Sequence, residues 1–154
     1  MLYEALHQNM RLRSLFLAAL MTLSVLSGVV ANDTVTTQDV DISGNYVMTG
    51  NYTVSHGTTL TIKPGTVVDM QDYWMKVEGT LIADNATIMS SIQTTGQGSH
   101  NAGVWDALTI SQGGTAILDN VTISNAKSCI IVDGTLTATS LTIEAVSYTH
   151  LTLP

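Results

Sequence analysis

The chain has 154 residues and a formal net charge of −7, and only 11% of its residues are charged. This length suits a single domain, and a hydrophobic fraction of 45% is too high for the low-hydrophobicity, high-charge composition of disordered chains. Both arginines, Arg11 and Arg13, precede residue 14. The rest of the chain lacks the clustered Lys and Arg that binding to nucleic-acid phosphates requires, so we exclude nucleic acid as a partner.

The first 31 residues have the three parts of a secretory signal peptide. A basic stretch at Met10–Ser14 precedes an apolar run at Leu15–Val30, and small or apolar residues at Val29–Ala31 suit a signal peptidase. We predict a signal-peptide helix over residues 1–31, cleavage after Ala31, and a secreted or cell-surface protein, with Met10 as an alternative start. The apolar run of about 16 residues is shorter than the roughly 20 that span a bilayer, so an uncleaved membrane anchor is the alternative.

A repeat occupies the middle of the chain. Each copy begins with Gly-Thr and ends with Thr-Ile, and a looser copy begins at Gly57. The three copies that align without gaps are Gly79–Ile88, Gly114–Ile123 and Gly134–Ile143. Once a polar insertion at 93–103 is set aside, the copies recur about every 20 to 25 residues, which is the period of a solenoid.

Short strands explain this repeat better than helices or leucine-rich units. Gly and β-branched residues interrupt every helical window, and apolar residues alternate with Thr in pairs. The pairs are Leu60/Ile62, Leu81/Ala83, Ala86/Ile88, Leu108/Ile110, Val121/Ile123 and Leu141/Ile143. We predict an all-β chain that forms a right-handed parallel β-helix of about four turns over residues 32–145. Its isoleucines would stack inward, its threonines would face water, and its corner glycines would supply positive φ.

A β-propeller or a β-sandwich is the alternative fold, because short strands and glycine turns suit those architectures too. The near-identity of the repeat copies favours the coil.

A family resemblance supports the coil. Gly57–Gly65 has the pattern Gly-x-x-Leu-x-Ile-x-Pro-Gly, and Val77–Leu81 has Val-x-Gly-x-Leu. Together, these steps resemble the opening of exported right-handed parallel β-helix proteins of the pectin-lyase-like kind, over roughly residues 39–144. That family includes polysaccharide lyases and hydrolases, adhesins and surface proteins. Residues 146–154 instead resemble a translated sequencing adapter, which implies an artefact there and an N-terminal fragment of a longer protein.

Catalytic groups of such a family are sparse in this sequence. β-helix lyases use a basic side chain, often Arg, whereas the expected mature chain has only Lys63, Lys76 and Lys127. β-helix hydrolases use paired aspartates; Asp84 and Asp119 occupy equivalent repeat positions and should stack, but an Asp beside Asn also caps a turn. We therefore expect no catalytic residue in this segment. The alternative is the N-terminal part of a polysaccharide lyase or glycoside hydrolase whose active site lies in further C-terminal turns.

No cofactor is predicted. Calcium prefers several oxygen ligands, which Asp-rich corners offer, but the chain has neither an EF-hand loop nor the calcium-binding nonapeptide of β-rolls. The single cysteine, Cys129, excludes a disulfide framework and a cysteine-based zinc site, and we expect it to be a small core residue.

Aromatic side chains are the candidate binding residues. Trp74, Trp105 and Tyr73 would suit stacking on sugar rings if they are exposed on a rigid coil. The alternative is that Trp105 anchors the insertion against the coil and Trp74 fills a corner. The resulting hypothesis is an adhesive or carbohydrate-binding scaffold whose partners are polysaccharides or cell-envelope glycans, with membrane contact only through the signal or a C-terminal anchor.

Four Asn-x-Thr sites are candidate N-glycosylation positions in an exported chain. They are Asn32, Asn51, Asn85 and Asn120. Asn85 and Asn120 are equivalent in the repeat, so hydrogen bonding at a corner explains them equally well.

Overall fold

The computed structural model describes residues 32–92 and 104–144, which form a coil of parallel strands without a helix. Sheet A contains β1 (Thr34–Val35), β4 (Tyr52–Val54), β7 (Met75–Val77), β9 (Leu108–Ile110) and β11 (Ile130–Val132). Sheet B contains β2 (Val40–Ile42), β3 (Asn45–Val47), β5 (Thr59–Ile62), β6 (Val67–Asp69), β8 (Thr80–Met89), β10 (Thr115–Ser124), β12 (Thr135–Thr139) and β13 (Thr142–Glu144). The predicted parallel β-helix is therefore confirmed. The predicted signal peptide at 1–31, the insertion at 93–103 and the terminal segment at 146–154 lie outside the described residues.

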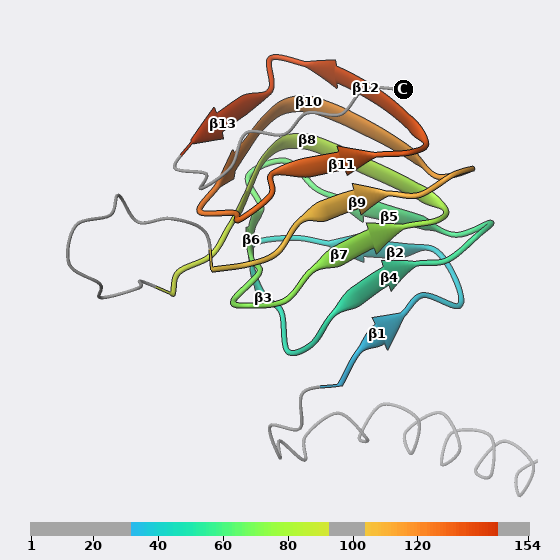
Figure 1. Ribbon diagram of the computed structural model, residues 1–154, viewed down its shortest axis with the longest axis horizontal. Coiled ribbons are helices and arrows are strands. Elements are labelled where there is room, and N and C mark those ends of the chain that lie inside the picture. The colour runs from blue at the N-terminus through green and yellow to red at the C-terminus, as the bar shows by residue number, and fades with distance from the viewer. Residues whose placement is uncertain (1–31, 93–103, 145–154) are drawn as a thin grey trace, which may run out of the picture. The chain divides into compact units, whose positions relative to one another are not determined.

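Each turn of the coil crosses sheet A once and then sheet B through two arms. Arm 1 consists of β2, β5, the first halves of β8 and β10, and β12; arm 2 consists of β3, β6, the second halves of β8 and β10, and β13. Figure 1 shows the strands of sheet A stacked above one another. They make five turns, one more than predicted, because the first turn at 34–47 has neither the Gly-Thr start nor the Thr-Ile end of the repeat.

The repeat copies stack in register. Thr80 pairs with Thr115, which pairs with Thr135, and the coil keeps its register across the insertion because Met75 pairs with Leu108. The looser copy is shifted by one residue from its predicted alignment, since Thr59 pairs with Thr80. The extra residue is taken up by a wider turn in which Gly57 has a φ of 75°.

The core lies between the two sheets and follows the predicted alternation. Both members of the first five predicted pairs are at most 5% exposed. Leu141 is only half-buried and Ile143 is 40% exposed, because this last pair lies in the fifth turn. Sheet A adds an inward row to the core, formed by Tyr52, Met75, Leu108 and Ile130.

Three glycines form a column at the corner between sheet A and arm 1. There is no space at these positions for the Cβ atom of any other residue. A Cβ on Gly114 would lie 2.2 Å from the carbonyl oxygen of Val77, and Gly79 and Gly134 are equally close to backbone oxygens of the preceding turn. None of the three has a positive φ. The predicted reason for corner glycines was therefore wrong at these positions, although it holds at Gly113, whose φ is 83°.

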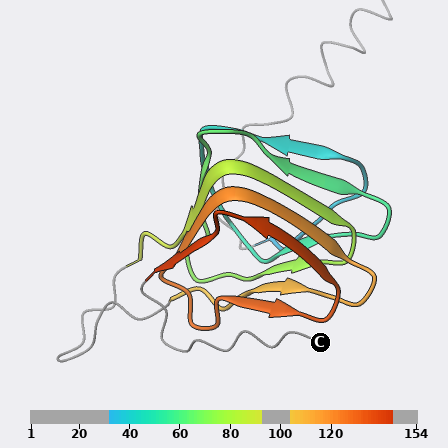
Figure 2. The same cartoon turned by 90° about the horizontal axis from the view of Figure 1, so that it is seen from above.

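Residues in the left-handed backbone conformation, with positive φ, form the bend between the two arms. Gly65, Asn85, Asn120 and Ser140 succeed one another in this column with φ between 46° and 77°. Nδ2 of Asn120 donates a hydrogen bond of 2.9 Å to Oδ1 of Asn85. Asn tolerates this conformation better than other residues with a Cβ, so one residue bends the strand while pairing continues on both sides. Figure 2 shows the resulting bend midway along β8 and β10.

Candidate functional site

Tyr73 and Trp74 lie at the corner where arm 2 passes into sheet A, between β6 and β7. The backbone N–H of Trp74 donates to Oδ1 of Asn51 at 3.3 Å, and its carbonyl accepts the N–H of Tyr52 at 3.0 Å. Both aromatic residues are half-buried, and Tyr73 packs against the core. Trp74 therefore combines a fixed backbone with partly accessible surface, and the prediction that it contacts a sugar stays a prediction.

Trp105 has a different environment from Trp74. It is 0% exposed, and its Nε1 donates a hydrogen bond of 2.9 Å to the carbonyl oxygen of Ser124. Its backbone forms a parallel bridge with Ala126. A fully buried indole offers no ring face to a ligand, so we remove Trp105 from the candidate sugar contacts and assign it to the core.

Asp84 and Asp119 stack as predicted, since they pair in register on β8 and β10, and both are exposed. Within 32–92 and 104–144, no group of three or more His, Cys, Asp or Glu side chains is arranged to hold a metal ion. Asp84 and Asp119 each precede an Asn of the hydrogen-bonded Asn85–Asn120 pair. Their position therefore fits the expectation that an Asp beside Asn occupies a turn.

Asp69 is another carboxylate with a structural role. Its Oδ1 accepts the backbone N–H groups of Gln71 and Ser91 at 3.1 Å and 3.0 Å, and its Oδ2 accepts Nε2 of Gln71 at 2.6 Å. Partial burial acts to raise the pKa of Asp69, but the hydrogen bonds from Ser91 and Gln71 outweigh it and hold the pKa below its usual value. Asp69 thus ties the corner after β6 to the corner after β8.

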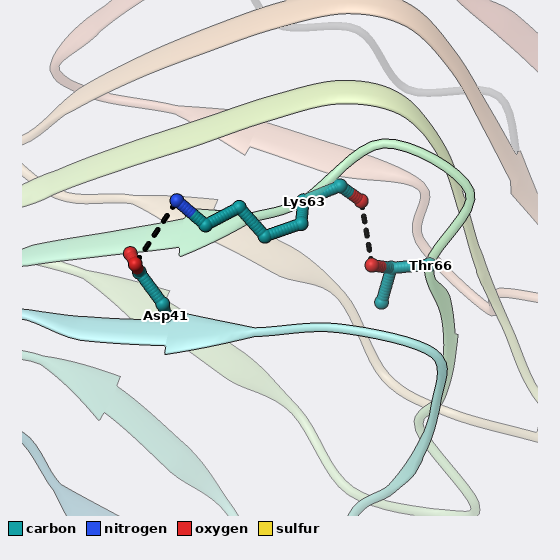
Figure 3. Close-up of polar contacts among 3 residues, drawn as sticks. All are labelled: Asp41, Lys63 and Thr66. Atoms are coloured by element: carbon teal, nitrogen blue, oxygen red, sulfur yellow. Dashed lines mark hydrogen bonds and ion pairs between the residues drawn. The ribbon is translucent and has the colours of Figure 1, made fainter.

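The three lysines are distributed over separate turns, and each forms an ion pair. Lys63 lies 2.9 Å from Asp41, Lys76 lies 2.7 Å from Glu78, and Lys127 lies 4.0 Å from Asp106. Figure 3 shows Lys63 reaching toward Asp41 of the preceding turn, while its carbonyl oxygen accepts the hydroxyl of Thr66. Exposed pairs of this kind stabilise a fold little, and no lysine joins a cluster of the kind that a lyase would use.

Cys129 lies in the core, as expected, at 5% exposure. Burial raises the pKa of its thiol to about 11, so the thiol is protonated at neutral pH. Only the thiolate is an effective nucleophile or metal ligand, and Cys129 is therefore inert.

The candidate glycosylation sites fall into two environments. Asn32, Asn85 and Asn120 are exposed, whereas Asn51 is half-buried and its Oδ1 accepts the N–H of Trp74. The side chains of Asn85 and Asn120 are hydrogen-bonded to each other at the corner. This bond explains why the repeat has Asn at this position. Glycosylation at the four positions stays a prediction.

A row of outward threonines is a surface feature that was not among the binding residues predicted from the sequence. Thr59, Thr80, Thr115 and Thr135 follow one another on arm 1, one in each turn from the second to the fifth. All four side chains are half-buried or exposed. The recurring Gly-Thr step contained the signal for this row, but only the stacking register shows that the row is continuous.

Comparison with known proteins adds no assignment. No protein-family model matches the chain, and neither a curated protein nor a solved structure matches it significantly. In the part of the chain that the structure describes, no helix is long and apolar enough to cross a membrane. Functional inference therefore rests on the surface of the coil itself.

Proposed function

We propose that this chain is an exported β-helix scaffold that binds polysaccharide, serves adhesion, and performs no catalysis in the described segment. The parallel coil gives it a rigid surface, because each inner turn is hydrogen-bonded to a neighbour on both sides. The resemblance of Gly57–Gly65 and Val77–Leu81 to exported β-helix proteins supports both export and a glycan partner.

Trp74 is the observation that carries the binding proposal. It is a large, half-buried aromatic side chain at a corner, and its backbone N–H and carbonyl are hydrogen-bonded to the neighbouring residues Asn51 and Tyr52 of the preceding turn. A side chain on a backbone that is already ordered loses less conformational entropy when a ligand stacks on it. Tyr73 beside it is anchored to the core and supports the same corner.

The alternative, an N-terminal part of a polysaccharide lyase or glycoside hydrolase, rests on the family resemblance alone. No observation among the described residues favours it, since the lysines are ion-paired in separate turns and the stacked Asp84 and Asp119 have no third carboxylate beside them.

Affinity electrophoresis of the full chain through gels that contain neutral or acidic polysaccharides tests the proposal. We expect at least one polymer to retard the wild-type chain, Trp74→Ala to weaken that retardation, and Trp74→Phe to restore part of it. Trp105 is fully buried, so its fluorescence emission serves as an internal check that each variant is folded. Full retardation of a folded Trp74→Ala variant, or no retardation of the wild type by any polymer, would contradict the proposal.

Export has its own test. Expression of the full chain in a secreting host, followed by N-terminal sequencing of the released protein, should give a mature chain that begins at Asn32. Retention of the whole chain in the membrane fraction would instead support the uncleaved anchor.

A further inference from the structure

The threonine row on arm 1 repeats one chemical group at one spacing. Thr59, Thr80, Thr115 and Thr135 pair directly from turn to turn, so their hydroxyls recur every roughly 4.8 Å along the coil axis. They are outward positions, because the residues that follow them in each strand point into the core.

A second outward row runs parallel to the first, about 6.6 Å farther along each strand. It consists of Thr61, Ile82, Ile117 and Thr137, which also pair directly from turn to turn. Ile117 is 42% exposed although it lies in an inner turn of the coil. We call these two rows the threonine face.

The threonine face has no charged residue from the second to the fifth turn. In the first turn, Asp41 pairs with Thr61, and Oδ1 of Asp39 accepts the backbone N–H of Thr59. The next outward positions are Lys63, directly after β5, followed by Asp84, Asp119 and Thr139 in the later turns, and Lys63 is paired with Asp41. A protein surface normally mixes charges of both signs over its outward positions. The face is therefore a neutral area over four turns. Asp39 and Asp41 lie at its first-turn end, and Lys63, Asp84 and Asp119 lie along one side.

The hydroxyls of the first row are available to a ligand. In the ranges 32–92 and 104–144, the side-chain hydrogen bonds use Thr36, Thr58 and Thr66 but not the hydroxyls of the threonine face. The backbone groups beneath them are already engaged in strand pairing. What the face offers is a fixed series of hydroxyl and methyl groups.

We propose that the threonine face is a binding site for a neutral, extended polysaccharide that lies along the coil axis. The ligand class rests on the proposed function, but the site is separate from the Tyr73–Trp74 corner, which joins arm 2 to sheet A. A pyranose ring is about as long as the spacing between turns, so successive sugars meet equivalent hydroxyls of successive turns. Ile82 and Ile117 provide apolar contact for the C–H faces of the rings.

Charge selects the neutral polymer over an acidic one. From the second to the fifth turn the face holds no cation to pair with a carboxylate or sulfate, and Lys63 on its border is already paired with Asp41. Asp84 and Asp119 along the same border repel anions. Together with the Tyr73–Trp74 corner, the threonine face would give the coil two polysaccharide contacts on different sides. Such a molecule bridges two polymer strands, which is the action that an adhesive scaffold requires.

Isosteric substitution tests the threonine face in the full chain. The triple variant Thr80→Val, Thr115→Val, Thr135→Val removes three hydroxyls, keeps the side-chain shape and retains β-branched residues in the strands. The matched control, Thr53→Val with Thr109→Val, makes the same change at outward positions of sheet A. The probes are soluble galactomannan and xyloglucan as neutral polymers and polygalacturonate as the acidic one, each cast into affinity gels.

In a Trp74→Ala background, where the threonine face is the remaining proposed contact, we expect the triple variant to weaken retardation by the neutral polymers about tenfold or more. Each lost hydrogen bond contributes modestly, and three are removed. In the same background the control variant should bind as the Trp74→Ala chain does, and polygalacturonate should not retard either variant. Unchanged retardation of the triple variant, or a preference for polygalacturonate, overturns this inference. If Trp74→Ala abolishes binding, or the triple variant in that background weakens it no further, the threonine face fails and the proposed function stands; if the wild type binds no polymer, both fail.

Discussion

The fourth and fifth turns of the coil contain aligned copies of one repeat and differ in burial on sheet B. Val121 and Ile123 of the fourth turn are 0% exposed, whereas the equivalent Leu141 is half-buried and Ile143 is 40% exposed. On sheet A the two turns agree, since Leu108 and Ile130 are both buried. The difference is therefore confined to the two arms of sheet B.

This contrast shows that a repeat unit does not define its own core. The fourth turn lies between the third and the fifth, and β10 pairs with strands on both sides. Among the described strands, β12 and β13 pair on one side only. Burial and stability of a solenoid unit come from its neighbours, so the same substitution should have different costs in the two turns.

The largest difference should come from a matched pair of core truncations. Ile123→Ala removes a fully buried side chain and should lower the free energy of unfolding by about 3 to 4 kcal/mol. Ile143→Ala, at the equivalent position, should cost about 1 kcal/mol or less, because much of that side chain already contacts water. Urea unfolding followed by circular dichroism measures both, and equal losses would show that the fifth turn is closed in solution.

The column of corner glycines gives a second matched pair. Gly114→Ala forces a Cβ to within 2.2 Å of the carbonyl oxygen of Val77, at a corner of a turn that has neighbours on both sides, with an expected cost of about 3 kcal/mol. Gly134→Ala meets Ser111 at 2.3 Å, but the fifth turn can move away, so we expect about 1 to 2 kcal/mol. Thermal melts of both variants test this order, and a larger loss at Gly134 would contradict it.

Ser140 of the fifth turn and Asn120 of the fourth are equivalent members of the column with positive φ. A substitution at Ser140 can therefore give the fifth turn the Asn that the fourth turn has. Ser140 has a φ of 53°, which costs a residue with a Cβ about 1 kcal/mol or more unless it is Asn. Ser140→Asn should therefore stabilise the coil by about 0.5 to 1 kcal/mol and extend the Asn85–Asn120 ladder by one member. The reverse change, Asn120→Ser, should destabilise by a similar amount. Urea unfolding of both variants measures the two changes. Destabilisation by Ser140→Asn, or stabilisation by Asn120→Ser, would contradict the prediction.

The smallest effect concerns Cys129, on the sheet A side of the fifth turn. Burial raises its pKa to about 11 in the fold from an ordinary value of 9.0, so the folded state disfavours the thiolate. Stability from this group is intact below about pH 9 and is lost as the pH rises toward 11, because only the unfolded chain then releases the proton. Alkylation by iodoacetamide at pH 8 should be slow in buffer and fast in urea. Rapid alkylation of the folded chain would show that this side of the turn opens.

Sequence reasoning predicted the coil because the Thr-Ile ends of the repeat identify inward isoleucines directly. It missed the first turn, whose inward positions include Thr36 and Tyr46, because a terminal turn need not follow the repeat. It also misjudged Gly79 and its equivalents, since a clash with the preceding turn depends on stacking and leaves no local signal in the sequence.

The candidate site was predicted less well than the fold. The sequence alone does not distinguish the environments of Trp74 and Trp105. The structure shows that Trp74 is a half-buried corner residue, whereas Trp105 is a core residue whose Nε1 is hydrogen-bonded. The threonine face was present as outward Thr in each repeat, but its continuity depends on the register across the insertion. That register is a long-range property, which the spacing of residues along the chain does not specify.

The corner between arm 2 and sheet A accepts added length without cost to the layers around it. Residues 70–74 and 125–129 make this connection in the second and fourth turns, whereas residues 90–107 make it in the third. The strands on both sides still pair residue for residue, and the entropy of a longer loop rises only slowly with its length. This corner is therefore a natural grafting point, where a new peptide can be displayed on the coil while the strands above and below keep their sequence.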